Sequence, residues 1–239
     1  DDYLHPNATN AAQSASWLFG ASDYNNGYAH THYSSSDMSW AWKRHAGFDV
    51  QAVTTTGSGY QFLKHNLGVA PEMVFMKKRD GTSDWHVWHK DLNGGTTPYN
   101  WSLHLNDNSA EWESGGNMWG LGGNPDATWV IILDSYFGGA GDYLMCLFAS
   151  VEGVCKCGTF SGVASNGNAT IDLGFTPRLF VSKRLDSSGG WYVWDTTRGM
   201  GSSGTEKPFF FNSNAAEGNA YDYVATTSDG ITLYGGIDA

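Results

Sequence analysis

Short runs of β-branched and aromatic residues, separated by turn-forming residues, make up the hydrophobic pattern of this chain. The clearest runs are Trp129–Leu133, Tyr143–Phe148, Leu179–Lys183 and Trp191–Asp195. Short runs of this composition, bounded by pairs such as Asp-Gly or Gly-Gly, are typical of strands joined by tight turns. The segments from Lys77 to Trp85 and from Lys183 to Trp191 have the pattern of β-hairpins.

Helix signals are weak along the whole chain. Ala11–Ala15 is the only helix-friendly stretch, and it is too short to be stable alone. Gly accounts for 31 of 239 residues, aromatic residues for 15% and charged residues for only 15%, a composition that suits strands with many turns. We therefore expect an all-β fold made of antiparallel β-sandwich units, of jelly-roll or lectin-like type.

The pattern repeats at a spacing of 106 residues without a gap. Of the 45 positions from Leu67 to Glu111, 13 are identical to the position 106 residues later. A register kept over this length predicts a duplicated domain. The expected organisation is residues 1–45 as the closing part of a preceding unit or an N-terminal extension, residues 46–151 as one β-sandwich repeat, and residues 152–239 as a second, incomplete one.

The second repeat stops before any counterpart of the strand around Tyr143–Phe148. Two explanations remain open at this point. Either the chain is a piece of a longer array, or the segment Met38–Lys43, which matches the closing strand at the same spacing, supplies the missing strand by folding back. An incomplete sheet would expose an edge that a neighbouring unit or subunit could cover.

Charge and cysteine content narrow the possible partners. The formal net charge is -11 and the pI is about 4.9, which argues against nucleic acid and against an anionic membrane surface as partners. No run of 18 apolar residues is present. Cys146, Cys155 and Cys157 are too few and too clustered for a disulfide framework, so we expect buried thiols.

Residues that recur in both copies are expected to form the core of the repeat. They are Trp85, Trp88, Trp191, Trp194, Pro71 and Pro177. Two tryptophans three positions apart on a strand point to opposite faces, so neither pair can form one flat platform for a sugar. Packing is therefore the preferred interpretation over ligand contact.

Aromatic and amide residues specific to the first copy are better candidates for glycan or receptor binding, because aromatic faces stack on sugar rings and amides bond to hydroxyls. The candidates are Tyr99, Trp101, Trp112, Trp119, Asn106 and Asn108. The competing interpretation is a Gly-rich loop covered by a neighbouring subunit.

Catalytic and metal sites have little support. Glycoside hydrolysis needs two carboxylates facing a cleft. Glu111 and Glu217 occupy equivalent places, but nothing in the sequence fixes a partner among Asp84, Asp107, Asp195 and Asp222. We therefore expect no catalytic residue, no cofactor and no enzyme activity. His30 and His32 could meet around a three-fold axis to bind a metal, although exposed histidines are the default interpretation.

Several repeated motifs, in a constant order, carry a resemblance to a known family. They are Gly174-Phe175-Thr176-Pro177, Val181-x-Lys183-Arg184-x-Asp186, Gly190 to Gly199, and Asn212-Ser213-Asn214-Ala215-Ala216-Glu217. This string resembles a repeat domain of virion proteins of tailed bacteriophages, including tail fibres, and Leu67–Met73 with Lys77-Lys78-Arg79 looks like a variant of it. The resemblance covers residues 38–235 and implies no catalytic residues.

The resemblance implies a non-enzymatic virion protein, in a tail fibre or related appendage, that extends or presents a host-binding surface. We expect a homo-oligomer, with a trimer favoured, in contact with other virion proteins. A host surface glycan is a further candidate partner. Its location would be the virion, extracellular after host lysis. The alternatives are a lectin-like glycan-binding module and, with less support, a polysaccharide depolymerase.

The two copies differ at one corner. The first copy has His89 and Leu92 where the second has Asp195 and Arg198. If Asp195 and Arg198 pair, the first copy must stabilise this corner in another way.

Overall fold

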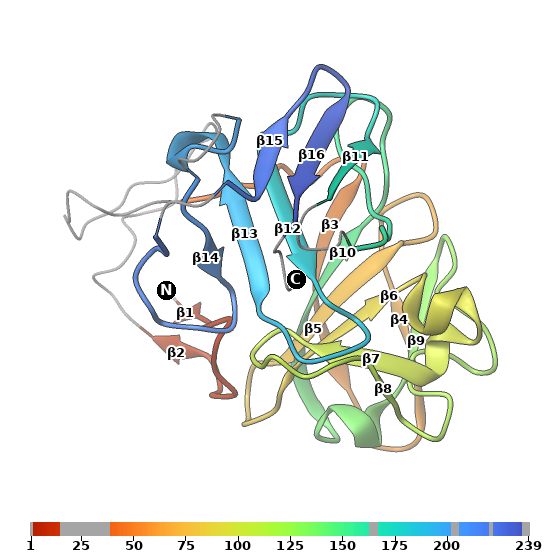
Figure 1. Ribbon diagram of the computed structural model, residues 1–239. Helices are drawn as coiled ribbons and strands as arrows, with labels where there is room; N and C mark the ends of the chain where they lie inside the picture. The colour runs from red at the N-terminus through yellow and green to blue at the C-terminus, as the bar shows by residue number, and fades with distance from the viewer. Residues whose placement is uncertain (1, 15–38, 163–166, 202–205, 220–221, 236–239) are drawn as a thin grey trace.

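The computed structural model describes residues 2–14, 39–162, 167–201, 206–219 and 222–235 (Figure 1). The protein is all-β, as expected, and its sheets are antiparallel. Within the described residues, the only helices are four 3-10 turns: η1 (Leu92–Gly95), η2 (Pro98–Asn100), η3 (Asp134–Phe137) and η4 (Thr196–Arg198). None of the helices in this part of the chain is long and apolar enough to span a membrane.

A six-stranded sheet with the order β3-β10-β5-β6-β7-β8 forms the largest layer. Its strands are β3 (Phe48–Thr55), β5 (Met73–Lys78), β6 (Trp85–His89), β7 (Trp101–His104), β8 (Trp112–Glu113) and β10 (Gly141–Phe148). The long strand β10 lies in the interior of the sheet, where Cys146 is aligned with Val50 on one side and Phe75 on the other. The predicted strand at Tyr143–Phe148 is confirmed, with two further residues at its start.

A two-stranded sheet packs against this layer. It pairs β4 (Tyr60–Lys64) with β9 (Trp129–Leu133). The side chains of Leu63, Val130 and Ile132 are buried and join the core formed by the large sheet. Because alternate residues of a strand point to opposite faces, the intervening residues of both strands face outward. The first half of the chain is therefore built like a sandwich.

The second half has two three-stranded sheets. One has the order β11-β16-β15, and the other β12-β13-β14. Their strands are β11 (Asn168–Asp172), β12 (Leu179–Lys183), β13 (Trp191–Asp195), β14 (Phe209–Phe210), β15 (Val224–Thr226) and β16 (Gly230–Tyr234). Trp194 of β13 lies in one core cluster with Val224 of β15 and Ile231 and Leu233 of β16. A Cβ at Gly230 would lie 1.9 Å from the Ile171 carbonyl oxygen, so only glycine allows this strand pairing.

Both predicted hairpins are present, as β5–β6 and β12–β13, and they begin 106 residues apart at Met73 and Leu179. The six residues expected in the core are all buried. Figure 1 shows the yellow and green strands of the first half beside the cyan and blue strands of the second.

The N-terminal segments differ from the expectation. The helix-friendly stretch is not helical where the structure describes it: Ala11 and Ala12 have no regular structure, and β2 (Gln13–Ser14) pairs with β1 (Asp2–Tyr3). Residues 39–44, which the repeat predicts as a strand, have no strand pairing, and Trp40 instead packs against side chains of the second half. The segment does fold back onto the second half, but it contributes a side chain rather than a sheet strand. Cys155 and Cys157 likewise follow a turn and are not on a regular strand.

Candidate functional site

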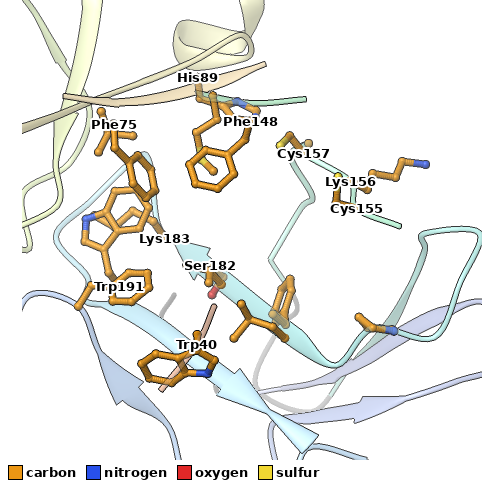
Figure 2. Close-up of a pocket in the computed structure, with 18 of the residues that line it drawn as sticks. Trp40, Phe75, His89, Phe148, Cys155, Lys156, Cys157, Ser182, Lys183 and Trp191 are labelled. Carbon is orange, nitrogen blue, oxygen red and sulfur yellow. The ribbon is translucent and has the colours of Figure 1, made fainter. Parts of the chain in front are cut away.

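A broad cleft lies between the two halves of the protein, with a volume of about 2460 Å³. Phe75 of β5 and Phe148 of β10 form one wall, and Ser182 of β12 and Trp191 of β13 form the other (Figure 2). The Phe75 ring meets the Trp191 ring edge-on at 6.2 Å and the Phe148 ring at 5.2 Å. Aromatic packing therefore connects the two halves at the base of this cleft.

Burial shifts the pKa of several ionisable groups around the cleft, and it deactivates the thiols of Cys155 and Cys157. Burial lowers the pKa of Lys183 to about 8 and raises that of Cys157 to about 12. Burial also raises the pKa of Cys155 and lowers that of His89. A thiol with a raised pKa is a poor nucleophile at neutral pH, because the thiolate is the reactive form. The cleft can accommodate a partner's surface, but these two thiols are not activated. All three cysteines are free, but each is only partly buried, whereas buried thiols were predicted.

The junction between the halves is fixed by Glu72. Its carboxylate accepts hydrogen bonds from the Lys90 ammonium at 2.5 Å and from the Ser150 amide at 2.7 Å. The Ser150 hydroxyl also donates to Glu72 and accepts from the Cys157 amide. Burial opposes ionisation of Glu72, but the bonds from Lys90 and Ser150 outweigh it and lower its pKa. The segment leading into the second half is therefore tied to the first.

A buried ion pair forms the corner after β13. Arg198 Nη2 lies 2.7 Å from Asp195 Oδ2, and both residues are less than a tenth exposed. Asp195 also accepts the Arg198 amide and caps η4. The Arg198 guanidinium lies 3.9 Å from the centre of the Phe209 ring and 5.3 Å from that of Trp40, whose indole nitrogen donates to Asp195. In the first half, fully buried Leu92 occupies the corresponding place.

Three loops follow equivalent strands and are named here by their residues. Loop A is residues 5–12, loop B is residues 104–111 and loop C is residues 210–217. Two turns, each of which links the strands of a hairpin, are named turn A (residues 79–85) and turn B (residues 185–191). Loop A packs on turn A, and loop B packs on turn B.

Loop A makes three hydrogen bonds to turn A. The Trp85 indole nitrogen donates to the His5 carbonyl at 2.8 Å. The Ser83 amide donates to the Thr9 carbonyl at 3.0 Å, and the Ala12 amide donates to the Arg79 carbonyl at 2.7 Å. The loop side of each bond is a backbone atom, so these contacts depend little on the side chains of the loop.

Loop B makes the corresponding three bonds to turn B. Trp191 donates to the His104 carbonyl at 2.8 Å. The Gly189 amide donates to the Asn108 carbonyl at 2.8 Å, and the Glu111 amide donates to the Leu185 carbonyl at 2.9 Å. Every donor and acceptor on the turn is 106 residues from its counterpart in the first set, and every one on the loop is 99 residues away. The pairing of β1 with β2 also matches that of β7 with β8 at a spacing of 99.

Each of loops B and C is anchored to its own sheet by an asparagine. Asn106 Oδ1 accepts the Trp85 amide at 2.7 Å, and Asn212 Oδ1 accepts the Trp191 amide at 2.9 Å. Asn106 Nδ2 also donates to Asp84 at 2.8 Å. Asn106, proposed from sequence as a ligand contact, therefore has a structural role in this protein.

The aromatic residues proposed for glycan binding lie against the core of the first half. Trp119 is fully buried, with its ring 4.8 Å from that of Phe137, so no face is open to a sugar. Tyr99, Trp101 and Trp112 are partly buried and pack on the same core. The four aromatic rings therefore do not form an exposed binding surface on a loop. The Asn108 side chain is exposed, while its carbonyl binds Gly189.

The carboxylates considered for hydrolysis are held in structural bonds. Glu111 accepts the amide of Asn93, a residue in the left-handed region with a φ of 53°. Glu217 pairs with Lys207 at 3.1 Å, and Asp107 pairs with His104 at 3.0 Å. In the described residues, no group of three or more His, Cys, Asp or Glu side chains could hold a metal. His30 and His32 lie outside the described residues.

An exposed aromatic residue that packs on a partly buried one was missed from the sequence. Phe62 of β4 is 56% exposed, and its ring meets that of Trp129 of β9 edge-on at 6.4 Å. Ile131 and Tyr60 lie on the same outward face. The continuous apolar run of β9 was a signal for this surface, because a strand with one solvated face alternates between apolar and polar residues.

Comparison with known proteins gives a family for the chain. A family model described as "Domain of unknown function (DUF7483)" matches residues 5–235. No curated protein and no solved structure matches.

Proposed function

The chain belongs to the DUF7483 family, and on that premise we propose that it is a non-enzymatic structural protein of a bacteriophage virion. In this proposal it forms part of a tail fibre or related appendage and extends or presents a host-binding surface. Its partners are further copies of itself, in a trimer, and other virion proteins. Its location is then the virion, extracellular after host lysis.

The observation that carries the proposal is the recurrence of one set of backbone contacts. Loop A on turn A and loop B on turn B use the same three hydrogen bonds. Recurring contacts between neighbours are what a stacked array of homologous units requires. They support an organisation in tandem units, residues 46–151 and 152–239, with residues 1–45 completing a preceding unit or forming an extension.

The chemistry of the candidate groups supports a structural role. Glu72, Glu111, Asp195 and Glu217 each bond to a partner that fixes a turn, a junction or a corner. The thiols near the cleft have raised pKa values, which suits packing and not nucleophilic attack. A protein built in this way stabilises an extended assembly by many small contacts, and symmetry multiplies weak adhesion.

Light scattering of the purified chain, combined with a reducing-end assay on bacterial polysaccharides, tests this proposal. The expected result is a stable trimer that releases no reducing ends. Release of reducing ends above that of a heat-denatured control would refute the non-enzymatic role. A monomer at all concentrations would contradict the trimer.

Glycan binding is a second candidate because exposed Phe62 lies beside the partly buried Trp129. An open aromatic face can stack on the apolar face of a sugar ring. The test is binding of the chain to a glycan array. Loss of a glycan signal in both Phe62→Ala and Trp129→Ala, but not in Val69→Ala, would favour a lectin. Absence of any signal for the intact chain would remove this candidate.

A further inference from the structure

The three loops share one sequence pattern but not one environment. Loops A and B share His, Asn and Ala at their first, third and seventh positions, and loop C has Phe, Asn and Ala there. The residues that follow the shared Asn in loop C, numbers 213–217, are all exposed. Loops A and B have only two exposed residues each, because a turn covers them.

In loop C, the backbone atoms that correspond to the docking contacts are available for hydrogen bonds. By position, the contacts of loop B to turn B correspond in loop C to the carbonyls of Phe210 and Asn214 and the amide of Glu217. No described residue bonds to the Asn214 carbonyl or to the Glu217 amide, and the Phe210 carbonyl has only a long bond of 3.4 Å from Ser213. Loop C therefore offers the donor and acceptor set of a docking loop.

The described residues contain three such loops and two turns that receive them. Turn B is held by loop B, which is continuous with the sheet of the first half. Turn A is held by loop A, which connects β1 to β2, and the sheet of these two strands has only two residue pairs. Asp2, Gln13 and Ser14 at the ends of that sheet are exposed. Loop A is therefore the easier of the two to replace.

We propose that loop C of one chain docks on turn A of a second copy, in the place that residues 2–14 occupy in the isolated chain. Residues 2–14 are then a competing occupant that limits assembly. The contact joins different surfaces of two identical chains head to tail, and it extends into an open filament where the rotation between neighbours does not close a ring. Arg79 of turn A carries a positive charge that suits the acidic Glu217 of loop C, whose amide would donate to the Arg79 carbonyl.

This inference deepens the proposed function and rests on it, since it assumes that the three loops are equivalent parts of one repeating structure. It predicts two interaction surfaces, one on each half of the protein. One surface is the row of residues 210–217, and the other is turn A together with the Trp85 indole nitrogen. Because the loop contributes backbone atoms, proline is the substitution that removes a contact.

The first experiment uses a chain that lacks residues 1–14, studied by light scattering over a range of concentrations. We expect its mass to increase with concentration beyond that of the intact chain, without a closed end point. A peptide of residues 1–14 should reverse the increase by refilling turn A. Glu217→Pro, which removes the docking amide, should prevent it, whereas Glu217→Ala should not.

A shortened chain that is folded by circular dichroism and keeps the mass of the intact chain would overturn the inference. Assembly that neither the peptide nor Glu217→Pro reduces would overturn it too, because it would be unspecific aggregation. If the intact chain is an inactive trimer and the shortened chain does not extend, only this inference fails. If the intact chain cleaves polysaccharide, the proposed function fails whatever the shortened chain does.

The complete chain provides a second variant in case the shortened one does not fold. Ala12→Pro removes the bond from loop A to the Arg79 carbonyl and leaves the rest of the chain in place. A fluorescent peptide of residues 207–219 should bind this variant about ten-fold more tightly than the unchanged chain, as expected for the loss of one competing hydrogen bond. Equal binding to Ala12→Pro and to the control Ala12→Ser would contradict the inference.

Discussion

The corner that follows the hairpin is built in opposite ways in the two halves of the protein. In the first half, Leu92 enters the hydrophobic core after β6. In the second half, Arg198 lies at the corresponding position and pairs with Asp195. The hairpins before both corners have the same register. One backbone can therefore be completed by an apolar side chain or by a buried ion pair.

The difference shows what a buried charge requires from the rest of the chain. Leu92 needs only apolar neighbours, whereas Arg198 needs a carboxylate, two nearby aromatic rings and a hydrogen-bond partner for that carboxylate. Trp40 supplies one face and the bond to Asp195, from a segment 155 residues away in sequence. The charged corner thus ties the segment before β3 to the second half, and the apolar corner makes no such link.

Arg198→Ala should have the largest effect, a loss of about 3 to 5 kcal/mol in the free energy of unfolding. It leaves the Asp195 carboxylate buried without its cation and removes the contact with Phe209. Urea unfolding followed by tryptophan fluorescence measures this loss. Leu92→Ala, the matched change in the first half, should cost about 2 to 5 kcal/mol through a cavity alone.

A double variant separates charge from volume. Asp195→His combined with Arg198→Leu gives the second half the corner of the first, and it should restore stability to within about 1 kcal/mol of the native protein. A double variant that is as unstable as Arg198→Ala would show that the two corners are not interchangeable.

Lys77→Met should give the next largest effect, and it should depend on pH. Burial lowers the pKa of both Lys77 and Lys183 from 10.5 to about 8. Between these values the unfolded chain binds more protons than the folded one, so the contribution of each lysine to stability rises with pH. The native protein should therefore gain about 2 to 3 kcal/mol relative to the variant between pH 7 and pH 10.

Lys183→Met is the matched control for this prediction. Lys77 also donates to the Thr9 carbonyl of loop A at 3.1 Å, whereas Lys183 donates to the Arg184 carbonyl beside it. The pH-dependent difference should be the same for both variants, because the pKa values are the same. Urea titrations at the two pH values that gave no difference for either lysine would contradict the assigned burial effect.

Local patterns predicted the strands and hairpins well. The runs Trp129–Leu133, Leu179–Lys183 and Trp191–Asp195 are strands with those bounds. Their residues favour a pleated, half-buried surface, and glycine turns limit them. The pairing of β4 with β9 could not be predicted in this way, because residues 60 and 133 are joined by a contact that no local pattern specifies.

The candidate site was predicted less well, for two physical reasons. Aromatic residues near Gly and Ser, such as Trp119, read as a binding loop, but burial of so much apolar surface favours the core. The docking contacts use backbone atoms, which leave little trace in sequence. The remaining sequence similarity is between Leu4-His5-x-Asn7 and Leu103-His104-x-Asn106. These motifs are 99 residues apart, so a comparison at a spacing of 106 residues misses them.

Asn106 and Asn212 provide the smallest and finest test of the comparison between the halves. Replacing either by Ala removes the acceptor of a tryptophan amide and should cost about 1 kcal/mol of stability. Asn106→Ala should be the costlier change, because its bond to Asp84 is also lost.

Replacement by aspartate keeps the acceptor oxygen in both places. Asn212→Asp should therefore be close to neutral, whereas Asn106→Asp brings a second carboxylate against Asp84 and should remain destabilising at pH 7. Lowering the pH to 4 should reduce that penalty, because protonation removes the repulsion. Thermal melts of the two aspartate variants at both pH values measure this difference, and equal penalties at pH 7 would mean that Asp84 does not distinguish the first loop anchor from the second.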